Sequence, residues 1–307
     1  MSKKGSSKST VFQMFDEIRG PLSTGDLKTA FTALVFLRWA AFEEAELEAI
    51  AAFEDVNCAP AGKPQFQWSE IDSPDLELRK TIDLLPNMVW KLRNSRNQLI
   101  SNAAAFATPA IEKLCQLPNE ISFRMVSWIA QVPFETPSDR LAVRDLMDGF
   151  LSNYSNKFAE EFSTPAEIAT LMAGLVEPQP GEHIFDPCFG SAGLLTSALS
   201  NLRQNNSARL DKMTEPALRV TGTEINRDTF VIGATRLGLS GAMDSYLLCG
   251  DSLRDAELHS SLGSFDVVLA NPPWGMKIDL HSQENHFPIQ TKDSTSLFLQ
   301  HLSLIHI

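Results

Sequence analysis

The run Asn271-Pro272-Pro273-Trp274, which follows the apolar stretch 265–270, is the segment whose residue types point most directly to chemistry. The exocyclic amino group of adenine is a poor nucleophile because its lone pair is delocalised into the ring. If the Asn271 side chain and the Pro272 carbonyl each accepted one N–H proton, this nitrogen would become pyramidal and more nucleophilic. The two prolines restrict the backbone, so the carbonyl would be held in place. The competing interpretation is a rigid turn that only ends a strand.

Trp274 adds an aromatic face to this run. Enzymes that modify a base take it out of the helical stack, and stacking on an aromatic side chain contributes about 1–3 kcal/mol per base. We therefore predict that Asn271, Pro272, Pro273 and Trp274 form a catalytic site. Group transfer to the amine there would be a direct in-line displacement that needs neither a metal ion nor a covalent enzyme intermediate.

Three acidic residues, Asp186, Glu224 and Asp251, each follow one of three successive predicted strands. In an open parallel sheet, ligands bind outside the carboxyl ends of the strands. Glu224 is placed to accept hydrogen bonds from both hydroxyls of a ribose, and Asp251 could accept one from the amine of an adenine. Taken singly, each acid could be a solvated loop residue. Together, the three predict a pocket for a nucleoside.

Asp186 opens a strand-to-helix turn of small residues that includes Gly190, Ser191, Ala192 and Gly193. Small residues let the backbone approach a ligand closely. The turn is neither a Walker loop nor a GxGxxG motif. By itself it could also serve only to pack a helix on a strand.

The elements around these residues alternate in type from about residue 165 onward. Strands are expected at 182–186, 218–223, 245–249 and 264–270, and helices at 165–176, 192–203 and 227–238. Thr164 and Glu167 should form a capping box, with Pro165 at the first helical position. This alternation predicts an α/β domain with a doubly wound, mostly parallel sheet.

The preceding part of the chain is expected to be mostly helical, with a surface loop at 57–69. The apolar spacing predicts helices within 11–50 and at about 75–103, 108–116, 121–132 and 139–152. We therefore expect an all-α N-terminal domain, 1–138, followed by the α/β domain, 139–307.

Composition and charge narrow the class of protein. The content is 43% hydrophobic and 21% charged, which is typical of a globular protein, and no stretch is apolar enough to span a membrane. The four scattered cysteines and the histidines have no metal-ligand spacing, so we expect no metal site and a cytoplasmic location. The net charge of −12 does not suggest a protein that grips DNA unaided, so a more basic partner should supply much of the DNA contact.

The order of these motifs resembles the modification subunit of type I restriction-modification enzymes, among the N6-adenine DNA methyltransferases of the gamma arrangement. Residues 161–165 resemble the EFYTP element of that family, 186–193 its DPACGSGG turn, and 271–274 its NPPF or NPPY motif. The resemblance implies a Rossmann-like methyltransferase fold and S-adenosyl-L-methionine as cofactor. It also implies DNA as substrate, a separate specificity subunit and a restriction subunit as partners. The cofactor-binding residues that it implies are Glu161, Phe162, Ser163, Thr164, Pro165, Asp186, Gly190, Ser191, Ala192, Gly193, Glu224 and Asp251.

Three features depart from the family pattern. Ala192 replaces a glycine, which is tolerable unless that position needs a positive φ, and Trp274 replaces Phe or Tyr. Family members continue into further strands where this chain ends, so we expect an incomplete sheet and a truncated domain whose turnover alone is doubtful. The alternatives are methylation of RNA bases or of protein glutamine, and a non-catalytic subunit that acts by interaction.

Overall fold

The computed structural model describes residues 23–54, 68, 78–153, 164–206, 218–255, 263–278 and 287–305. Contacts divide the chain into two compact units, Met1–Glu160 and Glu161–Ile307. Within the described ranges, no helix is both long and apolar enough to cross a membrane.

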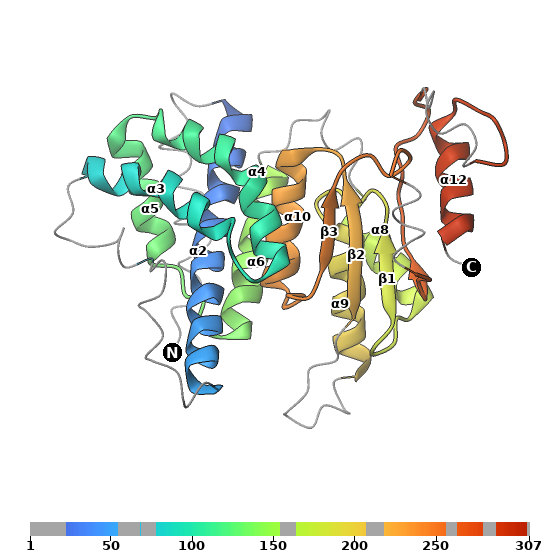
Figure 1. Cartoon of the computed structure of the whole chain (residues 1–307), viewed down its shortest axis with the longest axis horizontal. Coiled ribbons are helices and arrows are strands. Elements are labelled where there is room, and N and C mark those ends of the chain that lie inside the picture. The colour runs from blue at the N-terminus through green and yellow to red at the C-terminus, as the bar shows by residue number, and fades with distance from the viewer. Residues whose placement is uncertain are drawn as a thin grey trace. The chain divides into compact units, whose positions relative to one another are not determined.

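The first unit is helical in its described part, which confirms the prediction of a helical N-terminal region. Its helices are α2 (Thr24–Glu54), α3 (Leu78–Leu92), α4 (Gln98–Cys115), α5 (Asn119–Ala130) and α6 (Pro137–Asn153). Helix α2 contacts each of the other four (Figure 1). Phe31, Phe36 and Trp39 of α2 are fully buried, so this long helix forms the core of the unit.

The predicted domain boundary lies between residues 138 and 139. The first compact unit instead ends at Glu160 and so includes helix α6. The ring of Phe150 in α6 lies 4.2 Å from that of Phe31 in α2, so α6 packs with the helices before it. Where the functional domain begins stays a prediction.

The helix break expected between residues 103 and 108 lies elsewhere. Helix α3 ends at Leu92, and α4 begins after Asn97, whose side chain accepts from the backbone N–H of Ile100 at 3.1 Å. Helix α4 then runs through Pro109, which lacks the N–H that would bond the Ala105 carbonyl. The Arg93 side chain donates to that carbonyl at 3.4 Å instead, so α4 continues past the proline without leaving this acceptor unsatisfied.

The second unit contains a parallel sheet of four strands with the order β3-β2-β1-β4. The strands are β1 (His183–Asp186), β2 (Arg219–Glu224), β3 (Tyr246–Cys249) and β4 (Val267–Val268), and the first three lie side by side in Figure 1. The helices are α8 (Ala166–Val176), α9 (Gly193–Asn206), α10 (Arg227–Leu239) and α12 (Ser294–Ile305). The α/β fold class with a parallel sheet is confirmed.

The strand order creates a topological switch point beside β1. The chain passes from β1 outward to β2 and β3, and then returns to the other side of β1 as β4. Ligands of open α/β sheets bind at such a point, beyond the carboxyl ends of the strands. Asp186 ends β1, and Asn271 follows β4, so both lie at this position in the topology.

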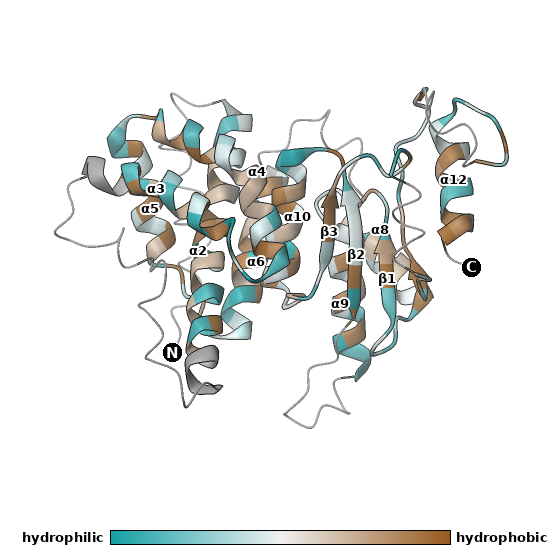
Figure 2. Ribbon diagram, viewed as in Figure 1, coloured by the Kyte–Doolittle hydropathy of each residue, from teal (hydrophilic) through white to brown (hydrophobic). Residues whose placement is uncertain are grey.

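Apolar residues of the strands and of α12 fill the core beneath the switch point. Phe185 of β1 is fully buried and stacks on Phe265, with ring centroids 4.6 Å apart, and Ile305 of α12 joins this cluster. Figure 2 shows hydrophobic colour on β3 and on part of β1, whereas much of β2 is pale. Although β4 pairs over two residues, the backbone N–H groups of Asp266 and Leu269 extend the ladder to β1.

Candidate cofactor and target-base site

Asp186 ends β1 with a carboxyl group that is almost wholly buried, at 1% exposure. Its Oδ1 accepts from the backbone N–H of Cys188 at 3.0 Å. Burial raises the pKa of Asp186 to about 7, with a smaller contribution from the nearby charge of Glu224. A cation bound against this carboxyl would favour its ionised form, and the resulting negative charge would stabilise the cation.

The turn after Asp186 requires left-handed backbone at two positions. Gly190 has φ 54° and Ala192 has φ 62°. Arg236 of α10 donates to the carbonyl of Ser191 at 2.5 Å and to its hydroxyl at 3.0 Å. Ala192 therefore has the positive φ that makes alanine unfavourable here, since an L side chain in this region costs free energy that glycine does not.

Replacing Ala192 by glycine should raise the free energy of unfolding by about 0.5–1 kcal/mol, because relief of the left-handed strain exceeds the added entropy of the unfolded chain. Thermal unfolding of the full chain measures this. Ala198→Gly, in the middle of α9, is the matched control and should lower stability. A destabilised Ala192→Gly variant would contradict the strain at residue 192.

Phe189 anchors the same turn by inserting its ring between two glycines. A Cβ on Gly222 of β2 would lie 2.7 Å from the Phe189 ring, and one on Gly233 of α10 would lie 2.6 Å from it. The backbone N–H of Phe189 also donates to the Thr223 carbonyl at 3.1 Å. The turn is therefore held against both β2 and α10.

Gly233→Ala should destabilise the chain by about 1–3 kcal/mol, because the new methyl group overpacks the slot of Phe189. It would also lie 2.8 Å from the backbone oxygen of Gly190, which cannot move without distorting the turn. Gly174→Ala in α8 is the control, since its Cβ would meet nothing closer than 3.9 Å, and helix propensity alone should stabilise that variant by up to about 1 kcal/mol. Urea unfolding measures the stability of both variants. Equal stabilities would show that the Phe189 ring does not fill the space beside Gly233.

Glu224 ends β2 and connects it to the β1 turn. Its Oε2 accepts from the backbone N–H of Gly190 at 2.9 Å, and its Oε1 accepts from that of Asn226 at 2.7 Å. Burial raises the pKa of Glu224, and the backbone N–H groups partly offset this. An ionised carboxylate has about four acceptor positions, and the backbone N–H groups of Gly190, Asn226 and Ile225 do not use all of them. The next residue, Ile225, is 67% exposed and presents an apolar face beside this carboxylate.

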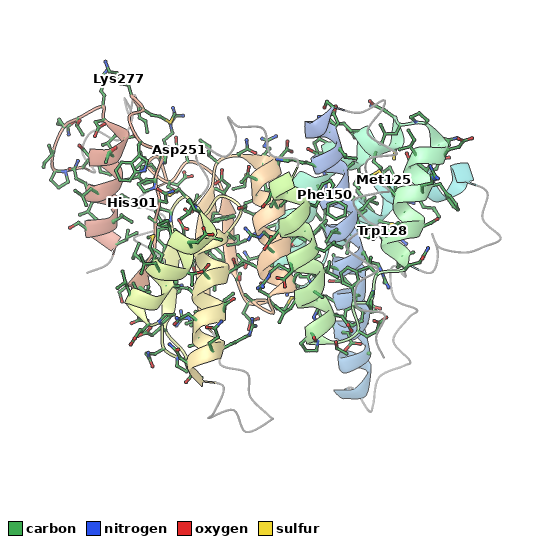
Figure 3. The ribbon with its side chains drawn as sticks, turned by 180° about the vertical axis from the view of Figure 1, so that it is seen from behind. Met125, Trp128, Phe150, Asp251, Lys277 and His301 are labelled. Carbon is green, nitrogen blue, oxygen red and sulfur yellow. The ribbon has the colours of Figure 1, made fainter. Side chains whose placement is uncertain are left out.

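Asp251 follows β3 at the same end of the sheet. Its Oδ1 accepts from the backbone N–H of Leu253 at 3.1 Å, and its Oδ2 lies 3.4 Å from Nε of Arg254. Figure 3 shows Asp251 at the loop end of the second unit, with Lys277 projecting beyond it into solvent. The hydroxyl of Ser252 donates to the Pro187 carbonyl, which ties the β3 loop to the β1 turn.

The side chain of Asn271 is held at both ends of its carboxamide. Its Nδ2 donates to the Thr164 hydroxyl at 3.0 Å, and its Oδ1 accepts from Nε1 of Trp274 at 3.2 Å. The Trp274 side chain is 64% exposed. The predicted capping box at α8 is wrong, because Pro165 is the N-cap residue and no side chain caps the helix. The Thr164 hydroxyl bonds Asn271 instead.

The two proline carbonyls differ in their partners. Buried Ser294, at the start of α12, donates its hydroxyl to the Pro273 carbonyl at 2.8 Å. Within the described part of the chain, no hydrogen bond reaches the Pro272 carbonyl. Pro272 is buried, and its carbonyl oxygen is an acceptor without a partner in this part of the chain.

Cys188 joins the two halves of the site. Its thiol contacts the Asp186 carboxylate on one side and the backbone N–H of Asn271 on the other. Burial, followed by the charges of Asp186 and Glu224, raises the pKa of this thiol. Cys188 thus connects Asp186 with Asn271, and Gly190 in the same turn binds Glu224. The sequence predicts the two acids for the cofactor and Asn271 for the target base.

The remaining predicted residues divide into two groups. Gly193 begins α9 and borders open space, whereas Glu161, Phe162 and Ser163 lie outside the described residues. Ser294, Arg236 and Ile225 were not predicted from the sequence. Only Ile225 carried a usable signal, since it is an apolar residue directly after a strand-end acid.

Comparison with known proteins identifies the family of this chain. The family model described as N-6 DNA methylase matches residues 139–304, more than half of the chain. The chain belongs to the N-6 DNA methylase family. The match confirms the family resemblance that the motif order predicted.

Several related proteins share limited sequence identity with this chain. The type I restriction enzyme EcoEI methylase subunit of Escherichia coli is 24% identical over 180 residues, which cover 58% of this chain and 36% of that subunit. A chain from a solved type I R-M system superposes with a TM-score of 0.76 at 20% identity, covering 99% of this chain and 62% of that one. The type I methyltransferase subunit of Streptococcus thermophilus superposes with a TM-score of 0.71 at 17% identity, covering 98% of this chain and 71% of that one. These likenesses show a shared fold, and the chain spans about a third of the length of the E. coli subunit.

Proposed function

We propose that this chain transfers the methyl group of S-adenosyl-L-methionine to N6 of adenine in DNA, as the modification subunit of a type I-like restriction-modification system. The observation that carries the proposal is that Asp186, Glu224 and Asn271 lie at the carboxyl ends of the neighbouring strands β1, β2 and β4, beside the topological switch point. Family membership supports the reaction class, and similarity to methylase subunits of type I systems supports the type of system.

The residues at the carboxyl ends of β1, β2 and β3 fit this cofactor. Gly190 and Gly193 leave open space, because a Cβ on Gly190 would meet only one atom, at 4.0 Å, and one on Gly193 would meet none. The buried carboxyl of Asp186 suits a cationic amino group, and the Glu224 carboxylate suits a ribose hydroxyl. Ile225 offers an apolar surface for the adenine ring, and Asp251 an acceptor for its amine.

The chemistry at the target base follows from Asn271 and Pro272. When bound, the cofactor supplies an electrophilic methyl group on a sulfonium. Oδ1 of Asn271 and the carbonyl of Pro272 accept hydrogen bonds from the two N–H groups of the target amine. These two hydrogen bonds set the direction of its lone pair. Neither oxygen is basic enough to remove a proton beforehand, so the amine would release its proton to water only after it has taken up the methyl group. Trp274 stacks on the flipped base.

Sequence recognition requires partners. With a net charge of −12, the chain is poorly suited to hold DNA phosphates alone. A separate specificity subunit would read the DNA site and position the duplex, and a restriction subunit would complete the system.

The test is nucleoside mass spectrometry of products formed with isotope-labelled cofactor. The chain, reconstituted with a specificity subunit, is incubated in parallel with duplex DNA, RNA and protein. Labelled N6-methyladenine in the DNA alone is the expected result. Label confined to RNA bases or to glutamine would overturn the proposal in favour of those substrates, and no label in any sample would favour a non-catalytic role.

A further inference from the structure

We propose that Thr164 is a positioning residue for Asn271, and that its hydroxyl, together with the indole N–H of Trp274, sets the orientation of the Asn271 carboxamide. The proposal concerns a contact that lies 107 residues apart in the chain. Its kinetic consequence rests on the proposed function, whereas its structural part does not.

The backbone before α8 places Thr164 with little freedom. Pro165 has φ −54° and ψ 142°, and a residue that precedes proline is restricted to extended conformations. The Thr164 side chain is half-buried, and its hydroxyl accepts from Nδ2 of Asn271 at 3.0 Å. The Thr164 hydroxyl thus does not cap helix α8 and instead binds the side chain of Asn271, which follows β4.

A carboxamide has nearly the same shape when its oxygen and nitrogen are exchanged, so its partners must define its direction. The hydroxyl of Thr164 can donate or accept, and therefore holds the group without choosing its direction. The indole of Trp274 can only donate, and it faces Oδ1 of Asn271 at 3.2 Å. In the reversed orientation two donors would face each other, so the pair together selects one state.

The selected state is the one that the proposed reaction needs. Oδ1 of Asn271 keeps a second lone pair for the target amine, while Nδ2 is turned away toward Thr164. The indole of Trp274 is mostly exposed and stacks on the base in the proposed mechanism. Thr164 is therefore the partner that holds Asn271 from the interior, and Trp274 gives this chain a donor that Phe at the same position would lack.

The contact can be observed directly by NMR of the full chain with ¹⁵N-labelled asparagine. The Asn271 side-chain signals are assigned by their absence in Asn271→Asp. In Thr164→Val these signals should move toward those of exposed asparagines, and their hydrogen exchange should be about tenfold faster because one hydrogen bond is lost. Thr164→Ser should restore them. Thr170→Val is the matched control, since that α8 hydroxyl bonds the Ala166 carbonyl at 2.8 Å and should leave the Asn271 signals unchanged.

Kinetics of the reconstituted complex give the second readout. Thr164→Val should lower kcat about tenfold, with KM for DNA and Kd for the cofactor changed less than twofold, and Thr164→Ser should recover kcat. Unmoved Asn271 signals in Thr164→Val would overturn the proposal, as would a raised cofactor Kd as the sole effect, which would assign Thr164 to the cofactor alone. Full activity of Asn271→Asp would instead refute the proposed function, and the NMR result would still decide the contact.

Discussion

Asn271→Ala should reduce methyl transfer to DNA by at least about 100-fold, the size of loss seen when one preorganised polar group is removed from an active site. The variant removes the acceptor for one N–H of the target amine and also the partner of Thr164 and Trp274. Single-turnover transfer with saturating cofactor measures the loss. Cofactor affinity, measured by calorimetry, should change little, because Asp186 and Glu224 keep their backbone hydrogen bonds.

Asn205→Ala is the control for this substitution. Asn205 lies exposed on α9, where its side chain bonds only that of Asn201 in the described structure, and its loss should leave transfer unchanged. Methyl transfer by Asn271→Ala within a few-fold of the unaltered chain would show that activation of the amine does not depend on this carboxamide.

The pH dependence of cofactor binding is the second large effect that we expect. Burial raises the pKa of Asp186 to about 7, so at pH 6 the free protein holds this carboxyl mostly protonated. The cationic amino group of the cofactor binds the ionised form. The Kd should therefore be about tenfold weaker at pH 6 than at pH 8, with release of a proton on binding at pH 6.

The same group has a calculable effect on the stability of the free chain. The folded pKa lies above the usual value of 3.8, so between about pH 4 and pH 7 the folded state binds more protons than the unfolded state. The contribution of Asp186 to stability is therefore fully present below this window and is lost as pH rises through it.

Asp186→Asn removes the titrating proton while keeping the shape of the side chain. Cofactor binding at pH 8 should weaken by about tenfold or more because a charged hydrogen bond is lost, and the affinity should become nearly independent of pH between 6 and 8. Asp228→Asn, an exposed acid in the first turn of α10, is the control and should keep the pH profile. A pH profile that survives in Asp186→Asn would assign the titration to another group.

The elements that surround the site could be predicted because their signals are local. Alternating strands and helices indicated the parallel sheet, and a residue at the end of a strand can be located to within one or two positions. Asp186, Glu224 and Asp251 accordingly lie where the pattern placed them, at the carboxyl ends of three neighbouring strands. The position of Asn271 after β4 follows from the same logic.

The contacts that orient the site residues could not be predicted, because their partners are distant in the sequence. A threonine before a proline and a helix is a typical capping residue, yet the hydroxyl of Thr164 serves Asn271. The continuation of α4 through Pro109 likewise depends on Arg93, which satisfies a carbonyl from outside the helix. In each case the structure depends on a hydrogen bond to a residue distant in the sequence, which the local pattern does not show.

A crystal structure of the chain with sinefungin tests the central claim most directly, since this analogue carries an amine in place of the transferable methyl group. We predict that its ribose hydroxyls bond the Glu224 carboxylate, that its amino-acid portion lies against Asp186, and that its extra amine points toward Asn271 and Pro272. Sinefungin bound elsewhere, or bound with that amine directed away from Asn271, would contradict the account.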